Sequence, residues 1–308
     1  MGIVVEDRKK EDRKMPPCFY KRIISTLIVL LFGLSSYSFA QVKLATSIPP
    51  FKAILQHVVG ERGDVYAILP PGASPHTFEA KPKNFLQVEA ATALFYGSEH
   101  LDKWVLTFKN DNRISLLQLL PAKDRLELRG FYGKNKGRPL GVDPHFWTSP
   151  RAVKSILPGL MKELIAIDPA GKEVYEKNAK AFAVTLDSLS ATVAEMMAKV
   201  NRAPVMMSHP SFQYFLKEFG FHLAGVIEVL PGTEPTAREV KELIETAKKE
   251  SVRVIFSDPQ HSSRPAELIR ESTGIKLCQL DPLGGTEGRM SYEEIILYNA
   301  QKIVEALQ

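Results

Sequence analysis

The order of apolar and polar positions predicts alternating strands and helices in the first half of the chain. Short apolar runs at residues 42–47, 65–69 and 93–96 have the length of buried strands, and segments with helical spacing lie between them at residues 50–60 and 83–91. Strands that alternate with helices favour βαβ units and a parallel sheet. We therefore predict an α/β lobe here, followed by a less regular strand and surface loop.

The second half of the chain repeats this plan. The pattern predicts strands at residues 205–208, 223–229, 252–256 and 275–280, and helices at residues 210–219, 236–249, 264–272 and 292–307. Thr236 is a suitable N-cap for its helix. The predicted fold class is thus α/β, with two Rossmann-like lobes that each contain a parallel sheet.

One long helical pattern connects the two halves. It follows a shorter predicted helix at residues 150–167 and begins at Asp168-Pro169, a good N-cap with Pro at the first helical position. The pattern continues to about residue 200, which corresponds to a helix about 45 Å long. We therefore predict a backbone helix at residues 168–201 that joins an N-terminal lobe, residues 41–167, to a C-terminal lobe, residues 202–308.

Composition adds little beyond an ordinary globular class. Hydrophobic residues make up 44% of the chain and charged residues 24%. The formal net charge is +5, but residues 1–40 contribute +3 of it, from seven Lys/Arg and four Asp/Glu. The chain has no Arg-rich stripe and no nucleic-acid-binding signature, so we expect no nucleic-acid partner.

The first forty residues have the pattern of a signal peptide. Two basic residues precede an apolar run at residues 23–34, which is shorter than the roughly 20 residues of a membrane span. Ser38 and Ala40 provide small residues at the spacing that signal peptidase requires. We predict export and cleavage after Ala40, with Met1 or Met15 as the start. The alternative is an uncleaved membrane anchor.

Cysteine usage restricts the kind of metal site. Cys278 is the only Cys after position 40, which excludes both an intramolecular disulfide in the mature chain and a zinc site built from several thiolates. A metal site in the mature chain would therefore need His and carboxylate ligands.

Three of the seven His residues, His76, His145 and His209, each lie next to a Pro and follow a predicted strand or turn. A neighbouring Pro stiffens the backbone and helps to orient a ligand. Asp281 ends the strand at residues 275–280, and ligands of open α/β sheets gather outside the carboxyl ends of strands. Three imidazoles and a carboxylate can complete a tetrahedral metal site. From the pattern alone, turn or core roles for these His explain it equally well.

The segments around these residues resemble a known family. They are residues 71–79, 143–147, 208–215 and 280–283, and two further matching segments are residues 234–238 and 256–260. In this order they resemble the metal-binding solute receptors of ABC transporters, cluster A-I, which capture zinc or manganese in bacteria. The resemblance extends from about residue 42 to the C-terminus.

This resemblance implies that His76 and His145 of one lobe and His209 and Asp281 of the other hold one divalent ion between two metal-binding lobes. It implies capture of Zn(II) in the periplasm rather than catalysis, and delivery to a membrane permease with its ATPase. It also implies a monomer in which the long helix allows only a small tilt of the lobes.

The chain departs from the family pattern at three places. Glu79 is followed by Ala80, where the family usually has Pro, and residues 109–142 contain no His, whereas many zinc-binding members have a His-rich loop there. His261 occupies a position that is often apolar in the family. We expect His261 and His100 to lie outside the ligand set, at the surface or behind the ligands, and His57 to lie on a helix surface.

The predicted donors favour zinc over manganese, because manganese prefers more oxygen ligands and manganese-selective relatives tend to have Glu in place of the third His. Because His must be neutral to bind a metal, we expect binding to weaken as the pH falls through about 6. The alternatives are a manganese- or iron-specific binding protein, an adhesin, and an exported zinc-dependent hydrolase with Glu79 as its base. The chain lacks the HExxH motif of zinc proteases.

Overall fold

The computed structural model describes residue 2 and residues 41–308, and the second range forms one unit. The predicted signal peptide and its cleavage site fall outside the described residues. Within residue 2 and residues 41–308, no helix is both long and apolar enough to span a membrane.

The first lobe contains a parallel sheet in the order β2-β1-β3-β4. Its strands are β1 (Val42–Thr46), β2 (Gly63–Ala67), β3 (Ala93–Tyr96) and β4 (Arg113–Ser115), and its helices are α2 (Pro49–Val59), α3 (Pro82–Glu89), α4 (Glu99–Asp102) and α5 (Leu116–Leu119). Every residue of β3 is buried, as expected of a strand covered on both faces.

The second lobe contains a parallel sheet in the order β10-β9-β7-β8. Its strands are β7 (Val205–Met207), β8 (Leu223–Val226), β9 (Val254–Ser257) and β10 (Lys276–Gln279), and its helices are α8 (Gln213–Glu218), α9 (Ala237–Lys249) and α10 (Arg264–Thr273). Leu243 and Ile269 belong to an apolar cluster between this sheet and helices α9 and α10. Two parallel α/β sheets confirm the predicted fold class.

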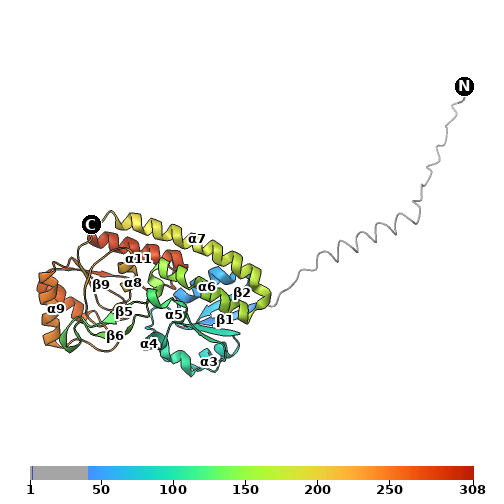
Figure 1. Ribbon diagram of the computed structural model, residues 1–308, viewed down its shortest axis with the longest axis horizontal. Coiled ribbons are helices and arrows are strands. Elements are labelled where there is room, and N and C mark those ends of the chain that lie inside the picture. Colours follow the sequence, from blue (N-terminus) through green and yellow to red (C-terminus); the bar gives the residue numbers. More distant parts are fainter. Residues whose placement is uncertain (1, 3–40) are drawn as a thin grey trace. The chain divides into compact units, whose positions relative to one another are not determined.

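The 26-residue helix α7 (Lys172–Met197) connects the lobes and is about 39 Å long. It contacts α2 and α6 (Pro150–Ile167) on one side and the closing helix α11 (Tyr292–Leu307) on the other (Figure 1). Helical conformation begins at the predicted Pro169, because Pro169–Gly171 forms a 3-10 turn that runs directly into α7. The Asp168 carboxylate accepts from Arg62 and Tyr175 instead of capping α7.

A short antiparallel hairpin, β5 (Glu127–Arg129) with β6 (Pro139–Val142), lies between the sheets in sequence and contacts the second lobe. The Tyr132 hydroxyl donates to the Ile227 carbonyl at 2.5 Å, and the Gly133 amide donates to Glu242 at 3.0 Å. The segment predicted as a strand plus surface loop is therefore a hairpin whose loop contacts the other lobe. His145 follows this hairpin closely in the sequence.

His57 is not the simple surface residue that we expected. Its ring stacks on Phe182 of α7 with centroids 4.1 Å apart, and its Nε2 lies 3.0 Å from a carboxylate oxygen of Glu293 on α11. The sequence of α2 did not indicate these contacts, because a His on the polar face of a helix has the same spacing whether or not another helix covers it.

Candidate metal centre

His76 lies in the loop after β2, and two contacts from the α4 region fix it. The Trp104 indole donates to the Pro75 carbonyl at 2.8 Å, which holds the backbone just before the His. The His76 Nδ1 lies 3.2 Å from the His100 carbonyl oxygen. Because a carbonyl only accepts, Nδ1 carries the proton and Nε2 keeps a free lone pair in the neutral ring.

His145 follows β6 and is held by a carboxylate two residues before it. Asp143 Oδ1 lies 2.7 Å from His145 Nδ1 and accepts from the His145 amide at 2.9 Å. Both residues are buried. A carboxylate on one ring nitrogen fixes the tautomer and makes the other nitrogen a stronger metal ligand.

His209 follows β7 directly, at the carboxyl edge of the second sheet. Its Nδ1 lies 3.0 Å from the Glu228 carbonyl oxygen, so its Nε2 is also the free nitrogen. That nitrogen lies 3.2 Å from His76 Nε2. The His145 ring centroid is 5.6 Å from that of His76 and 5.0 Å from that of His209. The three predicted His thus come together from both lobes.

Asp281 occupies the predicted strand end, but its carboxylate has other partners. Its Oδ1 accepts from the amides of Leu283 at 3.1 Å and Gly284 at 3.0 Å, and its Oδ2 lies 3.3 Å from Arg289 Nε. The structure therefore places this side chain in its own turn, and the small cavity between the imidazoles is lined by Pro282 and Leu283 instead.

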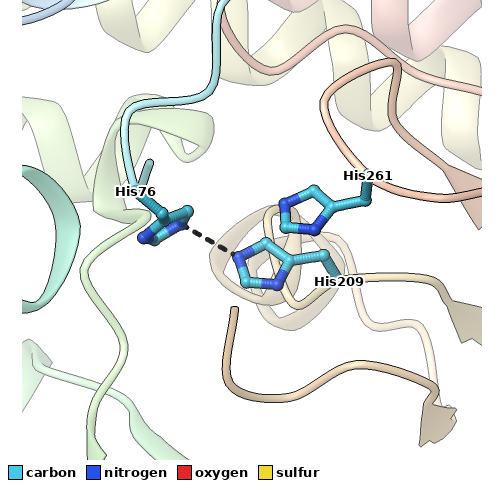
Figure 2. A group of neighbouring side chains, drawn as sticks. All are labelled: His76, His209 and His261. Carbon is cyan, nitrogen blue, oxygen red and sulfur yellow. Dashed lines mark hydrogen bonds between the residues drawn. The ribbon is translucent and has the colours of Figure 1, made fainter. Parts of the chain in front are cut away.

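His261 lies beside His209, which is the second of the two positions that we expected for it. Its side chain is 8% exposed, which excludes a surface role, and its ring stacks on that of His209 with centroids 4.1 Å apart and an angle of 16° (Figure 2). One ligand nitrogen from each of His76, His209 and His261 lies within 4.8 Å of the others. A sequence signal existed, since His261 comes shortly after β9 as His209 comes after β7.

A cavity of about 300 Å³ gives the imidazoles an opening. His76, His145 and His209 line it together with Glu99 and His100. His100 thus orients His76 through its carbonyl and also lines this cavity. Glu79, the base that a hydrolase would need, is exposed.

Burial keeps the imidazoles of His76 and His209 neutral. Burial and the neighbouring His145 and His261 lower the pKa of His76 to about 3, and burial lowers the pKa of His209 well below its ordinary value. Neutral imidazoles are ready to bind a metal without losing a proton first. For these two residues, protons therefore compete with the metal only at a lower pH. The predicted weakening of binding near pH 6 is wrong for them.

Comparison with known proteins decides the family. The sequence model described as zinc-uptake complex component A, periplasmic, or ZnuA, matches residues 44–306. This chain belongs to the ZnuA family. Membership makes it the substrate-binding component of a metal transporter and not an enzyme, as the sequence predicted.

Relatives within and around the ZnuA family carry both zinc and manganese in their names. The high-affinity zinc uptake system protein ZnuA of Bacillus subtilis is 24% identical over 278 residues, which cover 86% of this chain and 87% of that protein. The manganese ABC transporter substrate-binding lipoprotein PsaA of Streptococcus pneumoniae is 26% identical over 305 residues, which cover 92% and 97%. A crystal structure of ZnuA superposes with a TM-score of 0.73 at 29% identity, and covers 87% of this chain and 100% of its own.

Proposed function

We propose that this protein captures Zn²⁺ outside the cytoplasm and delivers it to the membrane permease of an ABC transporter, which its ATPase drives. One observation carries the proposal. Three imidazoles from two lobes have their Nδ1 atoms anchored to oxygens and their ring centroids 5.0–5.6 Å apart, with the Nε2 atoms of His76 and His209 separated by 3.2 Å. A metal-ligating His usually donates its other ring N–H to such an oxygen.

The proposed ligands are those predicted from the sequence. His76 and His145 come from the lobe at residues 41–167, and His209 and Asp281 come from the lobe at residues 202–308, with residues 168–201 as the connection. Asp281 binds the ion once its carboxylate has released Arg289 and the two turn amides. An ion held in this way joins the two lobes and closes all four positions, so it leaves no place for a catalytic water.

A competition titration of zinc against manganese tests the metal. Neutral imidazoles favour zinc, and manganese needs more oxygen donors than this cluster offers. We expect one tightly held zinc per chain, and a preference over manganese of at least roughly tenfold. His209→Ala is expected to lose the zinc, whereas His222→Ala, which alters an exposed His paired with Glu250, is the matched control. Zinc retained by the double variant His209→Ala, Asp281→Ala would contradict the site.

A manganese- or iron-specific function is the second candidate, because PsaA of Streptococcus pneumoniae is named for manganese. The same titration decides between them. Preference for manganese in the wild-type protein would replace the zinc proposal and leave the transport role intact.

For the exported form, we propose that residues 1–40 are a signal peptide removed after Ala40, and that the mature protein works in the periplasm as a monomer. Intact-mass analysis of the exported protein should give Gln41 as its first residue. Analytical ultracentrifugation should give the mass of one chain, with or without zinc.

A further inference from the structure

His261 is a fourth imidazole beside the three that the sequence predicts. We propose that His261 is itself a ligand of the bound zinc, so that the loaded protein holds the ion through nitrogen atoms of His76, His145, His209 and His261. This inference rests on the proposed capture of zinc and goes beyond it, since it replaces the oxygen of the expected ligand set with a nitrogen.

Distances decide whether His261 can take this position. Zinc bound to imidazole nitrogens at about 2.0–2.1 Å in a tetrahedron requires nitrogen–nitrogen separations of about 3.3 Å. The two Nε2 atoms of His76 and His209 already lie 3.2 Å apart. A ligand nitrogen of His261 lies within 4.8 Å of both, so a shift of roughly 1–2 Å brings these three nitrogens to the tetrahedral spacing.

The orientation of the ring fits as well. In Figure 2 the ring of His261 lies against that of His209, with one of its nitrogens directed toward His76. His209 and His261 come from the loops after β7 and β9, which are adjacent strands of one sheet. The carboxyl edge of this sheet therefore presents two neighbouring imidazoles to the His76 loop of the other lobe.

Two buried carboxylates stand behind His261. Its Nδ1 lies 3.5 Å from Glu228 Oε1, and its Nε2 lies 3.8 Å from Asp258 Oδ1. Both distances exceed the roughly 2.7–3.2 Å of a good hydrogen bond, so neither carboxylate locks the ring. The side chains of Glu228 and Asp258 are only 11% and 3% exposed. With one nitrogen on zinc, the other can donate to a carboxylate, as outer partners of ligating His commonly accept.

Charge supports the same assignment. Four neutral imidazoles add no charge to a divalent ion, so its two positive charges need buried compensation. Glu228 and Asp258 provide two negative charges behind His261, and Asp143 provides another behind His145. Ser211 holds Asp258 through its Oδ2 at 3.1 Å, while Asp258 Oδ1 has no hydrogen-bond partner among the described atoms.

Asp281 is the competing candidate, and its present contacts hold it back. To reach the ion it must give up two amide donors and the guanidinium of Arg289. His261 gives up no hydrogen bond shorter than 3.5 Å to do the same. We therefore assign His261, and not Asp281, as the fourth ligand of the loaded protein, in which the Asp281 turn stays closed.

The experiment compares His261→Phe with Asp281→Asn in the full mature chain. Phe keeps an aromatic ring against His209 and removes the nitrogens, and Asn keeps the size of Asp281 and removes its charge. We expect His261→Phe to weaken zinc binding at least about tenfold and Asp281→Asn to change it by less than about threefold. His222→Phe is the control for replacing a His that pairs with a carboxylate away from the site.

A spectroscopic measurement separates a ligand from a merely supporting residue. In wild-type protein with ¹⁵N-labelled His, long-range ¹H–¹⁵N spectra should show one ring nitrogen of His261 shifting on zinc addition in the same direction as those of His76 and His209. A bound zinc without this shift would overturn the inference, even if His261→Phe weakened binding. This test does not depend on whether the Phe variant folds.

Two further outcomes keep this inference separate from the proposed function. Loss of zinc in His209→Ala together with full affinity in His261→Phe would remove the role of His261 and leave zinc capture standing. A wild-type protein that binds no zinc would remove both.

Discussion

At the residue scale, an oxygen atom orients each of the three imidazoles that we propose as metal ligands. For His145 that oxygen belongs to Asp143, whose side chain contacts both the ring and the amide of the His. This makes Asp143 the one charged anchor among the three, since His76 and His209 use backbone carbonyls. A side-chain anchor can be changed by substitution, so it provides a direct test of preorganisation.

We predict that Asp143→Asn weakens zinc binding by about tenfold, because a neutral amide makes the imidazole a poorer donor and fixes its tautomer less firmly. Chelator competition at constant pH measures this change. Asp187→Asn is the control, since Asp187 pairs with Lys154 at an exposed position. Unchanged zinc affinity in Asp143→Asn would show that ring orientation does not depend on this carboxylate.

The lowered pKa of His76 predicts how the metal-free protein responds to acid. The folded protein protonates His76 only at about pH 3, whereas the unfolded chain does so at its ordinary value of 6.5. Below about 6.5 the unfolded state therefore binds one more proton, and stability falls as the pH drops toward 3, by about 1.4 kcal/mol per pH unit.

Urea unfolding of the metal-free protein between about pH 7 and pH 5 measures this slope. His76→Gln should lose its share of the decrease and become relatively more stable than wild type at the acid end. Parallel pH profiles for the two proteins would mean that His76 has the same pKa in the folded and unfolded states.

The sequence identified the three His that the structure brings together, because the Pro beside each marked a stiff turn at a strand end. It did not reveal that Asp281 turns back to Leu283, Gly284 and Arg289, since those contacts depend on the path of the following loop. For His261 it left two positions open, at the surface or behind the ligands, and the structure selects the second. The strand-end rule that selected His209 applies to His261 equally well.

At the element scale, the limits of two long helices were predicted correctly, and three short elements of the first lobe were missed. The predicted limits of α6 and α11 match the observed ones, whereas β4, α4 and α5 were not predicted. Elements of three or four residues show no measurable period and form only because the surrounding structure supports them. The first turn of α7 is a 3-10 turn, and the Asp168 carboxylate beside it binds Arg62 and Tyr175 instead of capping the helix.

The cap of α9 was predicted from Thr236, and the structure forms a capping box there. The Thr236 hydroxyl accepts from the Glu239 amide, and the Glu239 carboxylate accepts from the Thr236 amide at 2.9 Å. We predict that Thr236→Ala lowers the free energy of unfolding by about 1 kcal/mol and leaves zinc affinity unchanged.

Denaturant unfolding at one fixed pH checks this value, with Thr192→Ala as the control. Thr192 is exposed within α7, where its hydroxyl bonds only to the Ser188 carbonyl of the same helix. The same substitution there should change stability by less than about 0.5 kcal/mol. Equal losses at both positions would remove the capping explanation.

At the scale of the whole molecule, buried hydrogen bonds join the two lobes close to the imidazoles. The Trp147 indole donates to the Pro282 carbonyl, and the Tyr292 hydroxyl donates to the Trp147 carbonyl, both at 2.8 Å. The Tyr214 hydroxyl of α8 accepts from the Leu126 amide and donates to the Asp143 carbonyl. With α7 packed along both lobes, these ties oppose a wide hinge motion, so metal binding has to act through side chains and loops.

We therefore predict that zinc leaves the radius of gyration of the mature protein unchanged within the error of X-ray scattering. The double variant Trp147→Phe, Tyr214→Phe removes three of these bonds and keeps an aromatic ring at each position, so it should become measurably more compact on zinc addition. Tyr66→Phe, which removes a hydroxyl contact to Gln87 inside one lobe, should behave as wild type. A zinc-dependent contraction of the wild-type protein would mean that these bonds break on loading and that the lobes close as rigid bodies. In that case Asp281 would have a route to the ion, because the Trp147 bond restrains the loop that begins at Pro282.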